Sequence, residues 1–80
     1  MDGDCMVKAY ILIRTQIGMV DEVRDKLKRI PGIVSVDEVS GPIDIIAIAE
    51  ADSLRNLRNL IIGEIHAIEG VTRTETALVL

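Results

Sequence analysis

The sequence predicts one α+β domain with the element order βαββαβ, the ferredoxin-like arrangement in which a four-stranded antiparallel sheet carries two helices on one face. Two observations predict it. Similar phrases end both helical stretches, Ile30-Pro31-Gly32-Ile33 and Ile68-Glu69-Gly70-Val71, and a run of strand-forming aliphatic residues precedes each helix. The chain therefore contains two strand–helix–strand units in tandem. We interpret residues 1–80 as a single domain with a flexible N-terminus at residues 1–5.

The first unit begins with a strand at residues 7–14. One of its two alternating faces is wholly apolar: Val7, Ala9, Ile11 and Ile13. A helix follows, because apolar residues recur at spacings of three and four: Val20, Val23, Leu27 and Ile30. Pro31-Gly32 ends this helix. Residues 33–40 are predicted as the second strand, where the neighbours Asp37 and Glu38 break the alternation and indicate a bulge or an exposed edge.

The second unit starts after the turn at Gly41-Pro42, with a third strand at residues 43–51. Asp52 or Ser53 then caps a second helix. The inner stripe of this helix is predicted from its apolar spacing: Leu54, Leu57, Ile61, Ile65 and Ile68. Gly63 inside it indicates either close packing by a neighbour or a tolerant site. The fourth strand is expected at residues 71–80.

The composition disfavours several classes of function. With 13 acidic and 9 basic side chains the net charge is −4, which opposes binding to nucleic acid or to an anionic membrane. Arg55 and Arg58 are the only basic pair on the second helix, and we expect them to be solvated. The single Cys5 excludes an internal disulfide. No basic signal segment and no apolar run of roughly 20 residues occurs, so we expect a cytoplasmic protein.

The sequence lacks the motifs of catalysis and of cofactor binding. It has no His/Cys/carboxylate cluster at metal spacing, no Ser-His-Asp set and no phosphate-binding glycine loop. We therefore predict no catalytic residue, metal site or cofactor. His66 is interpreted as completing the last turn of the second helix. A small ferredoxin-like oligomeric enzyme stays open as an alternative, and it would need His66 or Tyr10 beside Asp44 in a closed cavity.

Two right-handed crossovers place both helices on the same face of the sheet, so the other face is left bare. The side chains expected there are apolar, and a monomer rarely exposes so large an apolar patch. Burying such side chains stabilises an assembly by about 1.5–3 kcal/mol each. The sequence therefore predicts a homodimer packed through its sheets. The predicted interface residues are Tyr10, Leu12, Ile46, Ile48, Leu78 and Leu80.

The order of short motifs resembles a known family. The first helix ends in Ile30-Pro31-Gly32-Ile33, and the turn Gly41-Pro42-Ile43-Asp44 enters an apolar strand. Ile68-Glu69-Gly70-Val71 is followed by Thr74-Glu75-Thr76 and by a terminal Val79-Leu80. In this order and spacing, residues 7–80 resemble the effector-binding (RAM) domain of the Lrp/AsnC transcription regulators, also called leucine-responsive or feast/famine regulators.

The resemblance implies a function and a site. Domains of this family form dimers through their sheets, assemble further into rings, and hold a small amino acid effector where two dimers meet. Carried over to this chain, the effector-binding residues are Gly41, Ile43, Asp44, Thr74 and Thr76. The chemistry is reasonable, because one carboxylate suits an ammonium group and a glycine turn exposes backbone N–H groups to a carboxylate. Ile43 stands where relatives commonly carry an aromatic residue, so we expect an apolar or branched-chain amino acid.

Family members usually carry a helix-turn-helix before this domain, and the few residues before Val7 leave no room for one. We therefore expect a module that does not bind DNA directly, with full-length regulators of the family as possible co-assembly partners. Two other interpretations stay open. In the first, the chain is a structural or heteromeric assembly partner without its own ligand. In the second, it is a relative of the amino-acid-binding ACT domain, which shares the topology. An alternative also stays open for the individual site residues. In that alternative Asp44 only satisfies the backbone of the turn, and Thr74 and Thr76 are ordinary strand residues.

Overall fold

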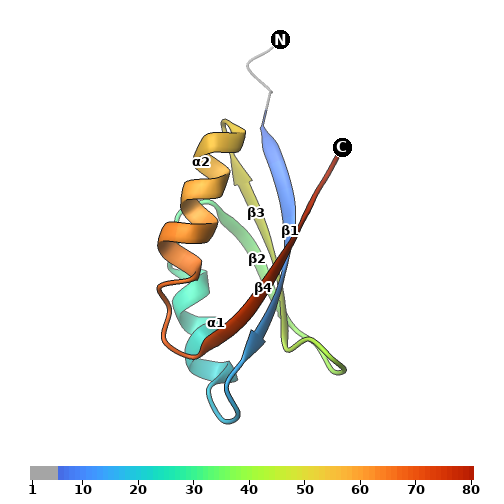
Figure 1. The fold of residues 1–80 in the computed structure, drawn as a ribbon, viewed down its shortest axis with the longest axis vertical. Coiled ribbons are helices and arrows are strands. Elements are labelled where there is room, and N and C mark those ends of the chain that lie inside the picture. The colour runs from blue at the N-terminus through green and yellow to red at the C-terminus, as the bar shows by residue number, and fades with distance from the viewer. Residues whose placement is uncertain (1–5) are drawn as a thin grey trace.

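A computed structural model describes residues 6–80, and the predicted flexible segment at residues 1–5, with Cys5, lies outside them. Seven elements follow in order: β1 (Val7–Thr15), α1 (Val20–Lys28), β2 (Ile33–Glu38), β3 (Ile45–Ala51), α2 (Leu54–Asn59), the π-helical turn η1 (Leu60–Ile65) that continues α2, and β4 (Val71–Leu78). Both helical segments lie on the same side of the sheet (Figure 1).

The four strands form one antiparallel sheet in the order β2-β3-β1-β4. The two central strands therefore start the two sequence units, and the two edge strands end them. The predicted ferredoxin-like fold is confirmed. β3 starts at Ile45, two residues later than expected, and β4 ends at Leu78. Ile43 and Asp44 consequently belong to the β2–β3 turn.

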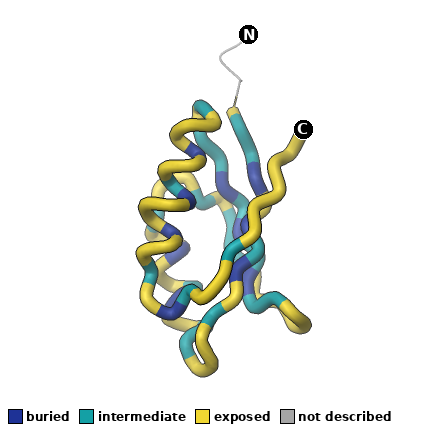
Figure 2. Tube along the Cα trace, in the orientation of Figure 1, coloured by how far each residue is buried: buried dark blue, intermediate teal, exposed yellow. Residues whose placement is uncertain are grey.

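The buried residues lie on the strands and helices where these face each other (Figure 2). The side chains of this core are wholly aliphatic. The predicted inner faces of β1 and α1 are confirmed, because β1 buries every second residue and α1 buries Val23 and Leu27. Among residues 6–80 no polar or charged residue is buried. The buried hydrophobic residues are Ala9, Ile11, Ile13, Val23, Leu27, Ile45, Ala47, Ala49, Leu57, Ile61 and Ile65.

The second helix departs from the predicted stripe at its first turn. Ser53 is the N-cap, and its hydroxyl oxygen accepts a hydrogen bond from the backbone N–H of Asn56 at 3.1 Å. Leu57, Ile61 and Ile65 are buried as predicted, but Leu54 is 48% exposed, so the prediction for Leu54 is wrong. The line of buried residues runs at spacings of four from Leu57, and Leu54, three residues earlier, falls to one side of it.

The π-helical turn η1 widens the helix over its last stretch. The backbone N–H of His66 donates to the carbonyl of Ile61, five residues earlier, at 3.1 Å. Gly63 lies in this turn, and a Cβ atom there would meet nothing within 4 Å. The site is therefore tolerant rather than tightly packed. π-helical turns are rare and occur frequently at functional sites.

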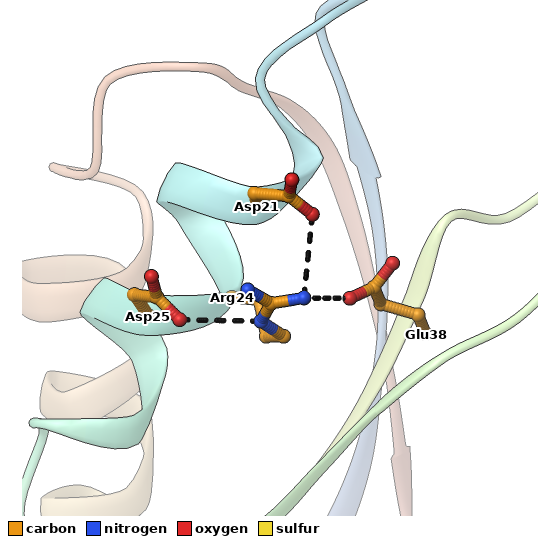
Figure 3. Close-up of polar contacts among 4 residues, drawn as sticks. All are labelled: Asp21, Arg24, Asp25 and Glu38. Carbon is orange, nitrogen blue, oxygen red and sulfur yellow. Dashed lines mark hydrogen bonds and ion pairs between the residues drawn. The ribbon is translucent and has the colours of Figure 1, made fainter.

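The edge strand β2 is tied to α1 by a charged cluster. Arg24 donates to the carboxylates of Glu38 on β2 and of Asp25 and Asp21 on α1 (Figure 3). Glu38, followed by Asp25, raises the pKa of Arg24 above its ordinary value, so the guanidinium stays charged. The expected exposed edge at Asp37 and Glu38 is confirmed, whereas the register shift of β2 lies earlier, between Ile33 and Ser35.

Candidate functional site

The face of the sheet opposite the helices carries a central apolar patch. Residues directly opposite each other in an antiparallel pair point to the same side. Tyr10 pairs with Ile48, and Leu12 pairs with Ile46. These four residues, which we call the open-face patch, alternate with the buried residues of β1 and β3. Their predicted place on the bare face is confirmed, and Tyr10 is 40% exposed there.

The predicted positions of Leu78 and Leu80 on this face are wrong. Leu78 pairs with Ala9, which is fully buried beneath the helices, so Leu78 lies on the helix side. Leu80 lies beyond the end of β4 and is fully exposed. Alternation along β4 does not show which of its faces is turned to the helices, because the two faces are similarly polar. One carries threonines and Leu78, and the other carries Arg73, Glu75 and Ala77.

The turn between β2 and β3 is held by Asp44. Its Oδ2 atom accepts from the backbone N–H of Thr15 at 2.8 Å and from the Thr15 hydroxyl at 3.3 Å. The Asp44 backbone N–H donates to the carbonyl of Ile13, and its carbonyl accepts from Val39, both at 3.0 Å. Asp44 therefore joins the turn to the end of β1, which agrees with a structural role for this residue. Gly41, at the tip, is exposed.

Thr74 and Thr76 lie on the helix side of β4, opposite Ile13 and Ile11. They line a groove of about 370 Å³ between β4 and the second helix, which we call the α2–β4 groove. The Thr74 hydroxyl lies within hydrogen-bond distance of Nε2 of His66. The full lining is Leu54, Leu57, Arg58, Ile61, Ile62, His66, Thr74, Thr76 and Leu78.

The helix wall of this groove was missed by the sequence interpretation. Leu54 was assigned to the core, Arg58 to a solvated face, and His66 to the end of the helix. Together with Ile62 they recur at spacings of four, so they share one side of the helix and all line the groove. That spacing was present in the sequence, but the adjacent and longer stripe through Leu57 concealed it.

A second hollow, of about 250 Å³, lies on the open face beside the β2–β3 turn. We call it the turn hollow. Ile43 lines it, together with Leu12, Arg14, Pro42, Arg73 and Glu75. The five predicted site residues therefore do not come together in one chain. Ile43 lines the turn hollow together with Arg73 and Glu75 of β4. Thr74 and Thr76 of the same strand face the α2–β4 groove instead, because successive residues of a strand point to opposite faces.

Neither a metal site nor a membrane span is found in the described part of the chain. No group of three or more His, Cys, Asp or Glu residues within 6–80 could hold a metal ion. None of the helices in this range is long and apolar enough to cross a membrane. The grouping of His66 or Tyr10 with Asp44 is not formed among residues 6–80, because His66 lies on the helix side, Tyr10 lies on the open face, and Asp44 is bonded to Thr15.

The model of the Lrp/AsnC ligand-binding domain matches residues 8–80. The chain belongs to this family. The resemblance read from the motif order is thereby confirmed, and the match covers both hollows and the open-face patch. The Lrp/AsnC domain is a regulatory, effector-binding module.

Two curated relatives show the contexts in which similar domains occur. An HTH-type transcriptional regulator, FL11 of Pyrococcus furiosus, is 35% identical over 74 residues, which cover 92% of this chain and 48% of the regulator. A homocitrate synthase of Sulfurisphaera tokodaii is 45% identical over 75 residues, which cover 92% of this chain and 16% of the enzyme. This Lrp/AsnC domain thus spans about half of the first relative and about a sixth of the second.

Solved structures agree with the fold. TTHA0845 of Thermus thermophilus is 30% identical, with a TM-score of 0.88 and 92% of each chain covered. A transcriptional regulator of Neisseria meningitidis, NMB0573, solved as a complex with L-Met, is 16% identical with a TM-score of 0.83, covering 92% of this chain and 49% of that one. At that identity the second likeness concerns the fold alone.

Proposed function

We propose that this Lrp/AsnC domain senses a free amino acid and, on binding it, modulates transcription regulators of its family. The observation that carries the proposal is the pair of hollows on a family-matched domain, one apolar with hydroxyl groups and one with paired charges. The Neisseria relative in fold, which was solved with L-Met, supports an amino acid as the ligand.

The open-face patch supports a homodimer formed by sheet packing. Tyr10, Leu12, Ile46 and Ile48 form a contiguous apolar area on the central strands β1 and β3. Covering such an area removes apolar surface from water, which is the main driving force of association. We expect this dimer to be the building block of a larger ring.

The interface proposal is tested by introducing a charge into the patch. Leu12→Lys places an ammonium group in the proposed interface, so we expect the dimer to dissociate. Ile17→Lys, at a fully exposed loop position, introduces the same charge elsewhere and should leave the dimer intact. Size-exclusion chromatography with light scattering measures both. A wild-type chain that runs as a monomer would contradict sheet packing.

The effector-binding residues proposed are Gly41, Ile43, Asp44, Thr74 and Thr76. The turn and the threonines face opposite sides of the sheet, so the five residues of one chain cannot all contact the same ligand. This separation supports a site between copies, in which the turn of one subunit and the threonines of another contact the effector. The groove walls formed by Leu54, Ile62 and Leu78 favour an apolar or branched-chain amino acid.

Calorimetry against the twenty amino acids tests the proposed effector. We expect an apolar amino acid to bind, and Thr76→Val to weaken that binding by roughly 2- to 10-fold through loss of one neutral hydrogen bond. Thr76→Ser keeps the hydroxyl and should retain the affinity. If no amino acid produces heat with the wild-type protein, the effector proposal fails.

A second candidate function is an assembly partner without its own ligand. The homocitrate synthase match favours it, because a similar domain makes up part of an enzyme there and not only of a DNA-binding regulator. Co-expression with full-length regulators, followed by native mass spectrometry, distinguishes the two functions. Stable mixed rings together with no response to amino acids would favour the assembly partner.

A further inference from the structure

The outer edge of β4 is open. β4 is the last strand in the sheet order β2-β3-β1-β4, and no further element among residues 6–80 pairs with it. None of its residues is buried. An edge strand presents a row of unpaired backbone N–H and C=O groups, which can pair with a strand of another chain.

A hydrogen bond at the end of β4 shows which residues carry these unpaired groups. The N–H of Val79 donates to the carbonyl of Lys8 at 2.9 Å, one step beyond the pair of Ala9 with Leu78. Opposite residues in an antiparallel pair alternate between those that exchange hydrogen bonds and those that do not. In the regular part of the β1–β4 pairing, the odd-numbered residues of β4 therefore bond to β1. The residues that direct their N–H and C=O groups outwards are Thr74, Thr76 and Leu78.

The other edge of the sheet is protected against such pairing. Asp37 and Glu38 place two adjacent carboxylates on β2, and Glu38 is bonded to Arg24 of α1. The register of β2 also shifts between Ile33 and Ser35, which interrupts its edge. Charges and irregularities of this kind are the devices by which proteins prevent edge pairing. In β4, by contrast, the pairing with β1 is regular from residue 73 to residue 78, and this stretch contains no proline.

The charges of β4 complement a second copy of the same strand. Arg73 and Glu75 lie on one face of β4, with Thr74 between them. When two β4 strands pair antiparallel about Thr74, Arg73 of each copy lies opposite Glu75 of the other. The two Thr74 residues then exchange hydrogen bonds through their outward N–H and C=O groups. Opposite charges that face each other across antiparallel strands stabilise the pairing.

The neighbouring registers lack this complementarity. Pairing about Arg73 or about Glu75 places like charges directly opposite each other, which is destabilising. Pairing about Thr76 places Glu75 opposite Ala77 and leaves the charges without partners. A register centred between two residues would set outward-directed residues opposite inward-directed ones, so that no hydrogen bonds could form. The charges thus select the register centred on Thr74.

We propose that β4 pairs edge to edge with β4 of a second copy, in the register centred on Thr74, and joins two four-stranded sheets into one continuous sheet. The contact is isologous, because both copies supply the same surface. It uses the edge of the sheet and leaves the open-face patch free, so one chain can make both contacts. Two different two-fold contacts on each chain extend an assembly beyond a dimer. The α2–β4 grooves of the two copies then flank the paired strands on the same side of the sheet.

The first experiment isolates this contact from sheet packing. Leu12→Lys removes the sheet-packed dimer, so a dimer that forms in this variant as the protein concentration is raised uses another surface. Sedimentation equilibrium without added amino acid should detect that dimer. Adding Thr74→Pro should weaken it by at least about 10-fold, because proline removes the central outward N–H and no hydrogen bond to β1. Circular dichroism checks that the proline variant is folded.

The second experiment tests the register through its charges. In the Leu12→Lys chain, Arg73→Glu or Glu75→Arg alone places like charges opposite each other, and each should weaken the dimer by roughly 5- to 50-fold. An equimolar mixture of the two variants should restore association, because opposite charges again face each other between the copies. The ion pair of Arg73 with Glu75 within one chain, at 3.5 Å, stays broken in both variants. Restoration in the mixture therefore cannot come from within one chain.

A matched control separates this register from general attraction between oppositely charged variants. Arg55→Glu and Glu64→Arg make the same charge changes at exposed positions of the second helical segment. In the Leu12→Lys chain, each should keep the dimer, and their mixture should associate no more tightly than either variant alone. A mixture that gains as much affinity as the β4 mixture would overturn the proposed register.

The remaining outcomes are equally definite. A Leu12→Lys chain that stays monomeric at millimolar concentration overturns the inference, and so does a dimer that neither Thr74→Pro nor the charge reversals weaken. If Thr74→Pro does not fold, the charge mixture decides: restored association supports β4 pairing, and its absence overturns it. Because no amino acid is added, these results do not depend on the proposed function. A chain that pairs through β4 but binds no amino acid would overturn only that function.

Discussion

The two strand–helix–strand units share a sequence pattern and a topology, but they pack differently. In the first unit, α1 closes onto its own strand β2, and Arg24 bonds to Glu38 across that contact. In the second unit, the helix lies over β3 and leaves the α2–β4 groove along its own strand. The repeat therefore specifies the order of elements, and the side chains decide which half is sealed and which half can admit a ligand.

The largest difference between the units is expected from matched core truncations. Leu27 of α1 and Leu57 of α2 are equally buried, with 0% and 1% of their surface exposed. Leu27→Ala leaves a closed cavity and should lower the free energy of unfolding by about 3–5 kcal/mol. Leu57 lines the groove, so Leu57→Ala enlarges a space that is already open to water, and we expect about 2–3 kcal/mol. Urea denaturation measures both, and equal losses would contradict the difference in sealing.

The glycines that end the two helices give the next prediction. Gly32 and Gly70 both have positive φ, +98° and +102°, so alanine at either position is strained by about 1–3 kcal/mol. A Cβ at Gly32 would also lie 3.2 Å from the backbone oxygen of Glu50, which cannot move aside easily. At Gly70 it would meet only the side chains of Val23 and Met19. Thermal unfolding should therefore show a larger loss for Gly32→Ala.

Gly63→Ala is the control for this pair. It lies in a helical turn with open space around it, so alanine should leave stability unchanged or raise it by up to about 1 kcal/mol. A clear destabilisation there would mean that the π-helical turn itself needs glycine.

The open groove should tolerate changes that a sealed core does not. Ile62 is 58% exposed on the groove wall, so Ile62→Ser should change the free energy of unfolding by less than about 0.5 kcal/mol. The same variant should weaken binding of an apolar amino acid if the groove contacts the effector side chain. Chemical denaturation and calorimetry on one preparation measure both quantities. A large loss of stability would indicate that the groove is part of the core.

The smallest expected effect concerns the charged contact of the first unit. Arg24→Gln removes the ion pairs with Glu38, Asp25 and Asp21, and we expect a lower melting temperature that approaches wild type as salt is added. Arg58→Gln, on the groove side of the second helix, is the matched control and should leave the melting temperature unchanged. Equal effects at both positions would remove this difference between the units.

The accuracy of the sequence interpretation differs between central and edge elements. Period-two alternation identified the buried face of β1 because that face is entirely apolar and the opposite face is mixed. The same reasoning gave the open-face patch. It failed on β4, where both faces mix polar and apolar side chains and only the pairing with β1 shows that Leu78 lies on the helix side. Leu54 was misplaced because two overlapping stripes in one helix both have helical spacing.

The sequence by itself determined the family, the element order, the helix-ending glycines and the aliphatic core. All of these depend on local spacing and on how hydrophobic each residue is. Tertiary structure alone decided the division of the predicted site into the turn hollow and the α2–β4 groove, and the meeting of Arg14 with Arg73. The physical reason is that strand register and parity depend on pairing between residues up to 69 positions apart, as for Ala9 and Leu78, which local periodicity does not encode.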